Sequence, residues 1–190
     1  MAPLLRQRGH DVVAPDLPTG DASANLDAYV DAAVGALGDR GDVTVVAQSL
    51  SGFVAPVVAA RRPVAALVLV NAMIPLPGET AGEWWSATGH VFPDPFDEVE
   101  IFLHDVPRDV RAAAAAHAHP QADRVFADPL PLDAWPDVPT RAVVCREDRF
   151  FTAEFQTRVL RDRLGLEPEL LDSGHCPALS RPEALVELLA

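Results

Sequence analysis

The sequence contains no lysine and only two cysteines. All 15 basic residues are arginines, and Cys145 and Cys176 lie in unrelated contexts. The missing amine excludes Schiff-base chemistry and a Walker-A nucleotide site, since each needs a lysine at a fixed position. Two cysteines are too few for a disulfide framework or a four-thiolate metal centre. We therefore expect neither a metal ion nor a cofactor.

Positive charge is scarce and long apolar runs are absent. The 15 basic residues face 28 acidic ones, which gives a formal net charge of −13. Nucleic acids and anionic membranes are bound by clustered cations, so this balance argues against both as partners. No apolar run reaches the ~18 residues that span a bilayer, and the N-terminus lacks the pattern of a secretory signal. We expect a cytoplasmic protein with a small-molecule partner.

The 190 residues, 49% of them hydrophobic, suffice for one globular domain with a substantial core. Short apolar runs alternate with amphipathic stretches, which predicts the α/β class: a mostly parallel sheet with helices on both faces. Strands are expected at residues 11–15, 43–47, 66–70, 141–145 and 169–171. Helices are expected at residues 2–8, 26–37, 53–60 and 153–164, and from 182 to the end.

The alternation breaks between residues 72 and 138. This stretch is rich in proline, holds all the tryptophans, and has an alanine-rich helix near residues 111–118. We interpret it as a helical cap insertion over one end of the sheet, within a single domain of residues 1–190. Trp84 and Trp85 could line an acyl pocket of such a cap, and packing in the core is the equal alternative.

A serine lies between the expected strand at residues 43–47 and the expected helix at residues 53–60. It is Ser49, in Ala47-Gln48-Ser49-Leu50-Ser51-Gly52. The nucleophile elbow is written G-x-S-x-G, and here Ala47 and Ser51 replace both glycines. Taken alone, a serine in a strand-to-helix turn is more often a helix cap.

Two further polar residues change that balance. Asp148 follows the strand at residues 141–145, and His175 follows the strand at residues 169–171. Both would lie at the carboxyl edge of the sheet with Ser49, and the chain order Ser…Asp…His is that of an α/β-hydrolase. Glu147 is a competing acid beside Asp148. The combination favours nucleophilic catalysis over helix capping.

The chain resembles the α/β-hydrolases, and most closely their small esterase and hydroxynitrile-lyase-like branch. The resemblance covers nearly the whole chain, with residues 72–138 matching only as a cap region, and is carried by residues 9–18, the elbow at Ser49, residues 148–156 and residues 174–182. It implies that Ser49 is the nucleophile, that His175 is the general base and acid, and that Asp148 orients His175. It also implies that the backbone N–H of Leu50 is one oxyanion donor.

The resemblance further implies a strand that the sequence does not show. In the family, a strand and a His-Gly-type loop precede the helix at residues 2–8. That strand lies between those expected at residues 11–15 and 43–47, and its loop supplies the second oxyanion donor. Either the start lies upstream of Met1, which we favour, or the protein is a shortened relative. A chain starting at Met1 would pair these two strands directly, or self-associate through their exposed edges.

Three functions stay open from the sequence. The first is a serine hydrolase, a carboxylesterase of small or medium apolar esters that forms an acyl-enzyme. The second is hydroxynitrile lyase-like activity, although the similar lyases carry a lysine beside the catalytic histidine, where this chain has Cys176. The third is a non-catalytic relative, suggested by the absent strand and the replaced elbow glycines.

Overall fold

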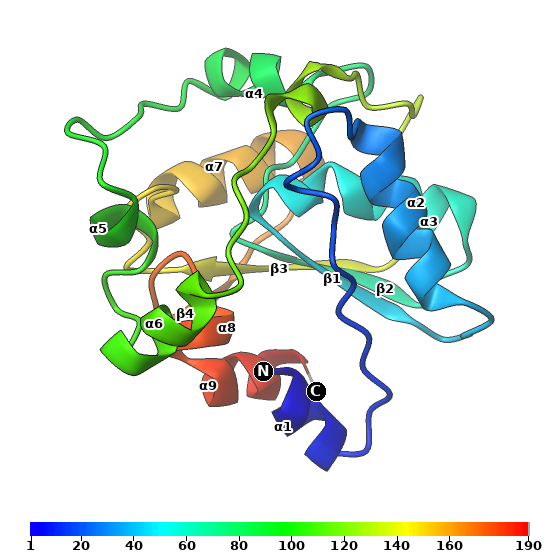
Figure 1. Cartoon of the computed structure of the whole chain (residues 1–190). Coiled ribbons are helices and arrows are strands. Elements are labelled where there is room, and N and C mark those ends of the chain that lie inside the picture. Colours follow the sequence, from blue (N-terminus) through cyan, green and yellow to red (C-terminus); the bar gives the residue numbers. More distant parts are fainter. Residues whose placement is uncertain (190) are drawn as a thin grey trace.

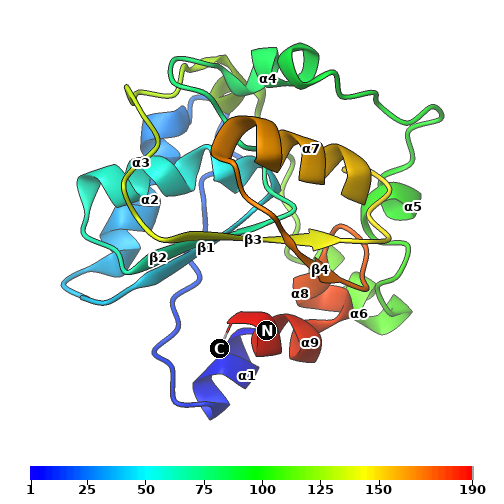
Figure 2. The ribbon, with the colours of Figure 1, turned by 180° about the vertical axis from the view of Figure 1, so that it is seen from behind.

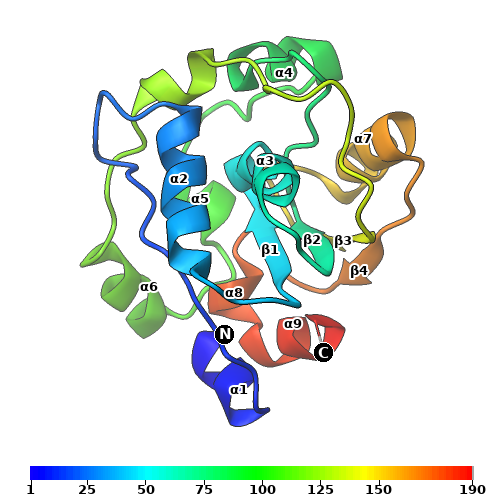
Figure 3. The ribbon, with the colours of Figure 1, turned by 90° about the vertical axis from the view of Figure 1, so that its right-hand side faces the viewer.

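The computed structural model describes residues 1–189, which form a four-stranded parallel sheet covered by helices on both faces. The α/β class is therefore confirmed. The strands lie in chain order and are β1 (Thr44–Gln48), β2 (Ala66–Val70), β3 (Thr140–Cys145) and β4 (Glu169–Leu171). Helix α3 (Val54–Arg61) connects β1 to β2, and α7 (Ala153–Leu164) connects β3 to β4. Figure 3 shows the strands side by side in this order.

Strand β2 is apolar throughout, and β3 is apolar from Ala142 onward, because both faces of the sheet are buried there. Leu67 and Leu69 of β2 face the larger core, under α2 (Leu26–Leu37), α3 and α7, whereas Val68 and Val70 face a smaller core. Helices α1 (Ala2–Gln7), α8 (Pro177–Ser180) and α9 (Pro182–Leu189) lie on that second face (Figures 1 and 2).

Local signals fix the ends of the long helices, and α2 and α7 have the expected bounds. The Asn25 side chain accepts a hydrogen bond from the Ala28 N–H at 3.0 Å and begins α2. The Thr152 side chain begins α7 in the same way, through the Phe155 N–H. Gly165 ends α7 with φ 65°, a left-handed conformation that glycine adopts without strain.

The strand expected at residues 11–15 is wrong. The segment belongs to no sheet, and Val13, Ala14 and Pro15 are exposed. Beta structure requires a hydrogen-bonded neighbour, and no other strand within residues 1–189 lies alongside this segment. It does not pair with β1 either, whose outer edge is open in the described part of the chain.

Residues 71–139 connect β2 to β3 and contain α4 (Ala81–Thr88), α5 (Glu98–Phe102), α6 (Arg108–Ala115) and the 3₁₀ helix η2 (Asp123–Ala127). Figure 1 shows α5 and α6 beyond the carboxyl end of β3, and α4 above α7. The alanine-rich helix expected near residues 111–118 begins one turn earlier, directly after Pro107. Within the described residues, no helix is both long and apolar enough to cross a membrane.

Candidate active site

Ser49 occupies a sharp turn between β1 and the short helix η1 (Ser49–Gly52). Its φ is 53°, a left-handed value that residues other than glycine rarely adopt. Two backbone hydrogen bonds hold this turn: the Ser49 N–H donates to the Asn71 carbonyl at 3.2 Å, and the Ser49 carbonyl accepts from the Met73 N–H at 2.9 Å. Strained backbone of this kind persists only when its surroundings fix it.

Asp148 and His175 form a buried hydrogen-bonded pair. His175 Nδ1 lies 2.7 Å from Asp148 Oδ2, and the two residues are each 4% exposed. Asp148 Oδ1 accepts the backbone N–H groups of Phe150 and Phe151 at 2.8 and 2.9 Å. Because an ionised carboxylate only accepts, the proton lies on Nδ1, and a neutral His175 keeps its lone pair on Nε2. Nε2 is thus free to accept a proton.

The competing acid is excluded from this pair. The Glu147 side chain is exposed. The Glu147 backbone N–H donates to the Ser173 carbonyl at 3.0 Å, and the Glu147 carbonyl lies 2.9 Å from His104 Nε2. Asp148 is the acid of the pair, as expected from the sequence.

A side chain next to the serine turn contacts the backbone of the histidine loop. Gln48, which precedes Ser49, donates from Nε2 to the His175 carbonyl at 2.8 Å. No hydrogen bond joins the Ser49 hydroxyl to His175 within residues 1–189. Leu50 lies in the first turn of η1, where a backbone N–H has no partner within the helix.

Aromatic rings surround His175. The ring centroids of Phe102, Phe150 and Phe151 lie 5.0, 5.8 and 5.6 Å from that of the imidazole. These rings exclude water from one side of the Asp148–His175 pair, and a drier environment strengthens its hydrogen bond. Phe150 and Phe151 are buried, and Phe102 is the partly exposed ring of the three.

The adjacent tryptophans of α4 lie in different surroundings. Trp84 is 0% exposed, belongs to the larger core, and donates from its indole N–H to the Ile74 carbonyl at 2.9 Å. Trp85 is partly exposed, and its ring centroid lies 5.8 Å from that of Phe150, next to the imidazole of His175. Of the two tryptophans, Trp85 is therefore the candidate for a pocket residue, whereas Trp84 is a core residue.

A second carboxylate holds the histidine loop from the segment between α5 and α6. Asp105 Oδ2 accepts the Gly174 N–H at 2.7 Å and the Ser173 hydroxyl at 3.3 Å. A Cβ atom at position 174 would lie 2.5 Å from Asp105 Oδ1 and 2.8 Å from His104 Nε2, so a side chain there would require these two side chains to move. Burial opposes ionisation of Asp105, but these hydrogen bonds, with those from Ser180, hold its pKa below the usual range.

Both thiols near the site are poor nucleophiles. Burial raises the pKa of Cys145 to about 12 and the pKa of Cys176 to about 11. The thiolate is the reactive form of cysteine, so neither residue supplies one near neutral pH. Burial likewise lowers the pKa of His90, whose ring packs against Phe150 with centroids 4.7 Å apart.

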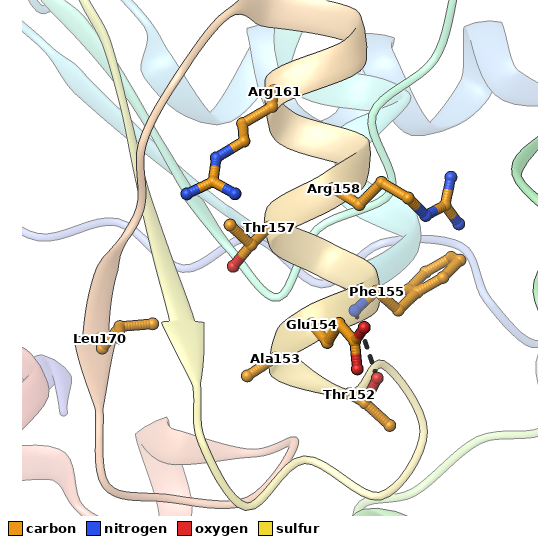
Figure 4. Close-up of a pocket in the computed structure, with 8 residues that line it drawn as sticks. All are labelled: Thr152, Ala153, Glu154, Phe155, Thr157, Arg158, Arg161 and Leu170. Atoms are coloured by element: carbon orange, nitrogen blue, oxygen red, sulfur yellow. Dashed lines mark hydrogen bonds between the residues drawn. The ribbon is translucent and has the colours of Figure 1, made fainter.

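A surface hollow of about 660 Å³ lies away from these residues, between α7 and β4. Figure 4 shows its lining, with Arg158 and Arg161 projecting from opposite sides of α7 and Leu170 reaching across from β4. Arg161 is already paired with the Glu167 carboxylate through two hydrogen bonds. The hollow includes none of Ser49, Asp148 and His175.

Sequence reasoning did not identify the residues that support the site, which include Gln48, Asn71 and Asp105. Asn71 was the easiest of them to predict, because it directly follows the strand expected at residues 66–70. Asparagine tolerates the left-handed conformation better than most residues. A polar residue at the end of each strand of a parallel sheet was therefore a signal.

The sequence model of the alpha/beta hydrolase family matches residues 1–188, so the chain belongs to this family. Among solved structures, it is similar to a pyrethroid hydrolase from Sphingobium faniae JZ-2, with 22% identity and a TM-score of 0.78 over 99% of this chain and 88% of that one. No curated protein matches the chain.

Two further similar structures are those of esterases. Polyneuridine aldehyde esterase shares 17% identity with a TM-score of 0.80, over 98% of this chain and 89% of that one. A methylesterase from Arabidopsis shares 18% identity with a TM-score of 0.78, over 99% and 89%. At these identities the likeness establishes a common fold.

Proposed function

We propose that this protein is a serine hydrolase of carboxylic esters, with Ser49 as nucleophile, His175 as general base and acid, and Asp148 as the carboxylate that orients His175. The observation that carries the proposal is the buried Asp148–His175 hydrogen bond of 2.7 Å, joined through Gln48 to the turn in which Ser49 has φ 53°. A histidine fixed in this tautomer is a base, and a serine on a strained turn is presented outward from the sheet edge.

The first half of the reaction acylates the serine. As Ser49 Oγ attacks the ester carbonyl carbon, its proton moves to His175 Nε2 and the carbonyl oxygen becomes an oxyanion. The Leu50 N–H is the proposed donor to that oxyanion. When the tetrahedral intermediate collapses, the bond to the alcohol oxygen breaks. His175 Nε2 returns its proton to that oxygen, leaving an acyl-enzyme and a free alcohol.

The second half hydrolyses the acyl-enzyme. Water attacks the acyl carbon and gives its proton to His175 Nε2, and collapse then expels Ser49 Oγ, which takes that proton back. In both halves Asp148 accepts the Nδ1–H hydrogen bond and stabilises the positive imidazolium without being protonated itself. The products are the carboxylic acid and the alcohol, and the enzyme is regenerated.

The proposed substrates are small or medium apolar esters. Support comes from the phenylalanine rings around His175 and from Trp85, since an apolar lining favours apolar acyl or alcohol groups. The names of the similar structures agree with ester hydrolysis, because they include a pyrethroid hydrolase and two esterases.

The test compares two serines of the same turn. The wild-type chain should hydrolyse p-nitrophenyl acetate or butyrate, Ser49→Ala should lose this activity, and Ser51→Ala should retain it. A fluorophosphonate probe followed by peptide mass spectrometry should label Ser49. Undiminished turnover by Ser49→Ala would discard the assignment. A wild-type chain that neither turns over ester nor reacts with the probe is a non-catalytic relative, and cyanide release from mandelonitrile would instead favour the lyase.

A further inference from the structure

Asn71 directly follows β2, and its backbone and side chain contact the serine, acid and histidine segments alike. It is 0% exposed and has φ 42°, a left-handed value. Its own N–H donates to the Val143 carbonyl of β3 at 3.0 Å, which continues the β2–β3 ladder past the end of β2. The residue is therefore rigidly placed in the sheet.

Three hydrogen bonds lead outward from this position. The Asn71 carbonyl accepts the Ser49 N–H at 3.2 Å. The side-chain oxygen Oδ1 accepts the Cys145 N–H at 2.8 Å, at the end of the strand that leads to Asp148. The side-chain nitrogen Nδ2 donates to the His175 carbonyl at 3.3 Å. One residue thus contacts the three chain segments that carry Ser49, Asp148 and His175.

The His175 carbonyl receives a second amide. Gln48 Nε2 donates to it at 2.8 Å, and within the described residues Gln48 and Asn71 are the donors that reach this oxygen. A buried carbonyl left without a donor is costly, so the two amides together fix the backbone position of His175. If one is removed, the other still satisfies the oxygen in part.

We propose that Asn71 is a positioning residue of the active site, which sets the distance between Ser49 and the Asp148–His175 pair, and that Gln48 shares its contact with His175. The inference rests on the proposed function. Asn71 does not touch the reacting atoms, and it acts by fixing the backbones that carry them. A misplacement of about 1 Å in reacting groups can cost about 100-fold in rate.

The decisive variant is Asn71→Gly. Glycine adopts φ 42° without strain and keeps the carbonyl that accepts the Ser49 N–H, so only the side-chain amide is lost. We expect kcat for p-nitrophenyl butyrate to fall about 10- to 100-fold with KM changed less than about 2-fold, because the ester-binding surface is untouched. Gln48→Ala should show a smaller fall. The double variant should lose more than the product of the two single losses, because the His175 carbonyl is then unpaired.

The matched control is Gln156→Ala. Gln156 is a buried amide that donates from Nε2 to the Ala72 carbonyl at 3.0 Å, one residue from Asn71, and within residues 1–189 it is hydrogen-bonded to neither Ser49 nor His175. Its loss should lower the melting temperature and leave kcat within about 2-fold of wild type. If Asn71 were merely structural, Asn71→Gly and Gln156→Ala would behave alike, and the proposal would fail.

A second measurement does not depend on turnover. The proton NMR signal of His175 Nδ1–H reports the hydrogen bond to Asp148, and it should be present in wild type and in Gln156→Ala but broadened or lost in Asn71→Gly. If wild type shows the signal but hydrolyses no ester, and Asn71→Gly loses the signal, the positioning role stands and the proposed function is refuted. An unchanged signal with unchanged kcat in Asn71→Gly would refute the positioning role alone.

Should Asn71→Gly fail to fold, Asn71→Asp tests the same contact. Aspartate has the shape of asparagine and keeps the oxygen that accepts the Cys145 N–H, but it replaces the donor to His175 with an oxygen. We expect a lower kcat and a changed His175 signal in this variant. Wild-type values for both would overturn the proposal.

Discussion

Gly52 packs directly against the carbonyl oxygen of Met73, so that a side chain at position 52 would overlap this oxygen. The contact joins the helix after Ser49 to the segment after β2, and the Met73 N–H in turn holds the Ser49 carbonyl. Of the elbow glycines, the chain lacks the usual ones at positions 47 and 51 but has glycine where the backbones are closest.

We expect Gly52→Ala to lower the free energy of unfolding by about 3 kcal/mol, because the added methyl group forces two backbones apart. Gly35→Ala is the matched control. Gly35 lies inside α2, and no atom is within 4 Å of where its Cβ would be, so alanine there should raise the free energy of unfolding by about 0.5–1 kcal/mol. Urea denaturation of both variants measures the effect. Equal stabilities for Gly52→Ala and wild type would contradict the close approach.

Asp148→Asn should abolish most of the ester hydrolysis while leaving the fold in place. The amide keeps the shape of the carboxylate, but it no longer holds His175 with its proton on Nδ1, and it does not stabilise the imidazolium. We expect kcat to fall by about 10⁴-fold. Steady-state kinetics on p-nitrophenyl butyrate measures the loss. Glu147→Gln, at the exposed neighbour, should remain within about 2-fold, and a comparable loss there would reassign the acid.

Replacing Trp84 by alanine should mainly lower stability, whereas replacing Trp85 should mainly weaken substrate binding. Trp84→Ala removes a fully buried ring with a satisfied indole N–H, and the cavity should cost about 3–5 kcal/mol of folding free energy. Trp85→Ala removes a partly exposed ring, so we expect a smaller loss of stability and a higher KM for p-nitrophenyl butyrate. Thermal unfolding and KM together separate the two roles. A KM for Trp85→Ala equal to that of wild type would remove Trp85 from the substrate pocket.

Alkaline pH should destabilise the protein through Cys145. Burial raises the pKa of this thiol from 9.0 to about 12, so between these pH values the unfolded state binds fewer protons than the folded state. Stability therefore falls as pH rises, by up to about 1.4 kcal/mol per pH unit. Urea unfolding at pH 8, 9, 10 and 11 measures this slope. Cys145→Ala should have a shallower slope above pH 9, and an identical slope would show that the thiol does not contribute.

The sequence predicted most of the sheet because its strands are short apolar runs between clear turn signals. Residues 66–70 and 169–171 form strands with the expected bounds. Residues 11–15 carry the same local signals, but a strand also needs a partner elsewhere in the chain, and local signals do not reveal one. The pairing of Asp148 with His175 was predictable because the ends of parallel strands meet at one edge.

The supporting contacts were beyond the sequence. Asn71 is held by hydrogen bonds to the backbones of three different segments, and its neighbours in the sequence do not predict the hydrogen bonds to Cys145 and His175. Trp84 and Trp85 are adjacent and chemically identical, and only the packing of α4 against the core distinguishes them. Such properties depend on tertiary distances rather than on periodicity or residue type.

The outer edge of β1 is the place where we expect the chain to associate with a second copy of itself. No strand within residues 1–189 pairs with this edge, and Val46 in its middle is 38% exposed. An open strand with an apolar surface is a template for pairing, and a single lysine on it disfavours such pairing. The net charge of −13 opposes contact between copies, so higher salt should favour association by screening this repulsion.

Size-exclusion chromatography with light scattering, at ~50 mM and ~500 mM salt, where the screening lengths differ about 3-fold, measures this association. We expect the dimer fraction of the wild-type chain to rise with salt, and Val46→Lys to remain monomeric in both. Leu170→Lys is the matched control, because Leu170 is 42% exposed on β4, the opposite edge, which spans only Glu169–Leu171. Short edge strands are poor templates, so this variant should associate as wild type does. A monomeric wild-type chain at high salt, or equal effects of both lysines, would rule out pairing through β1.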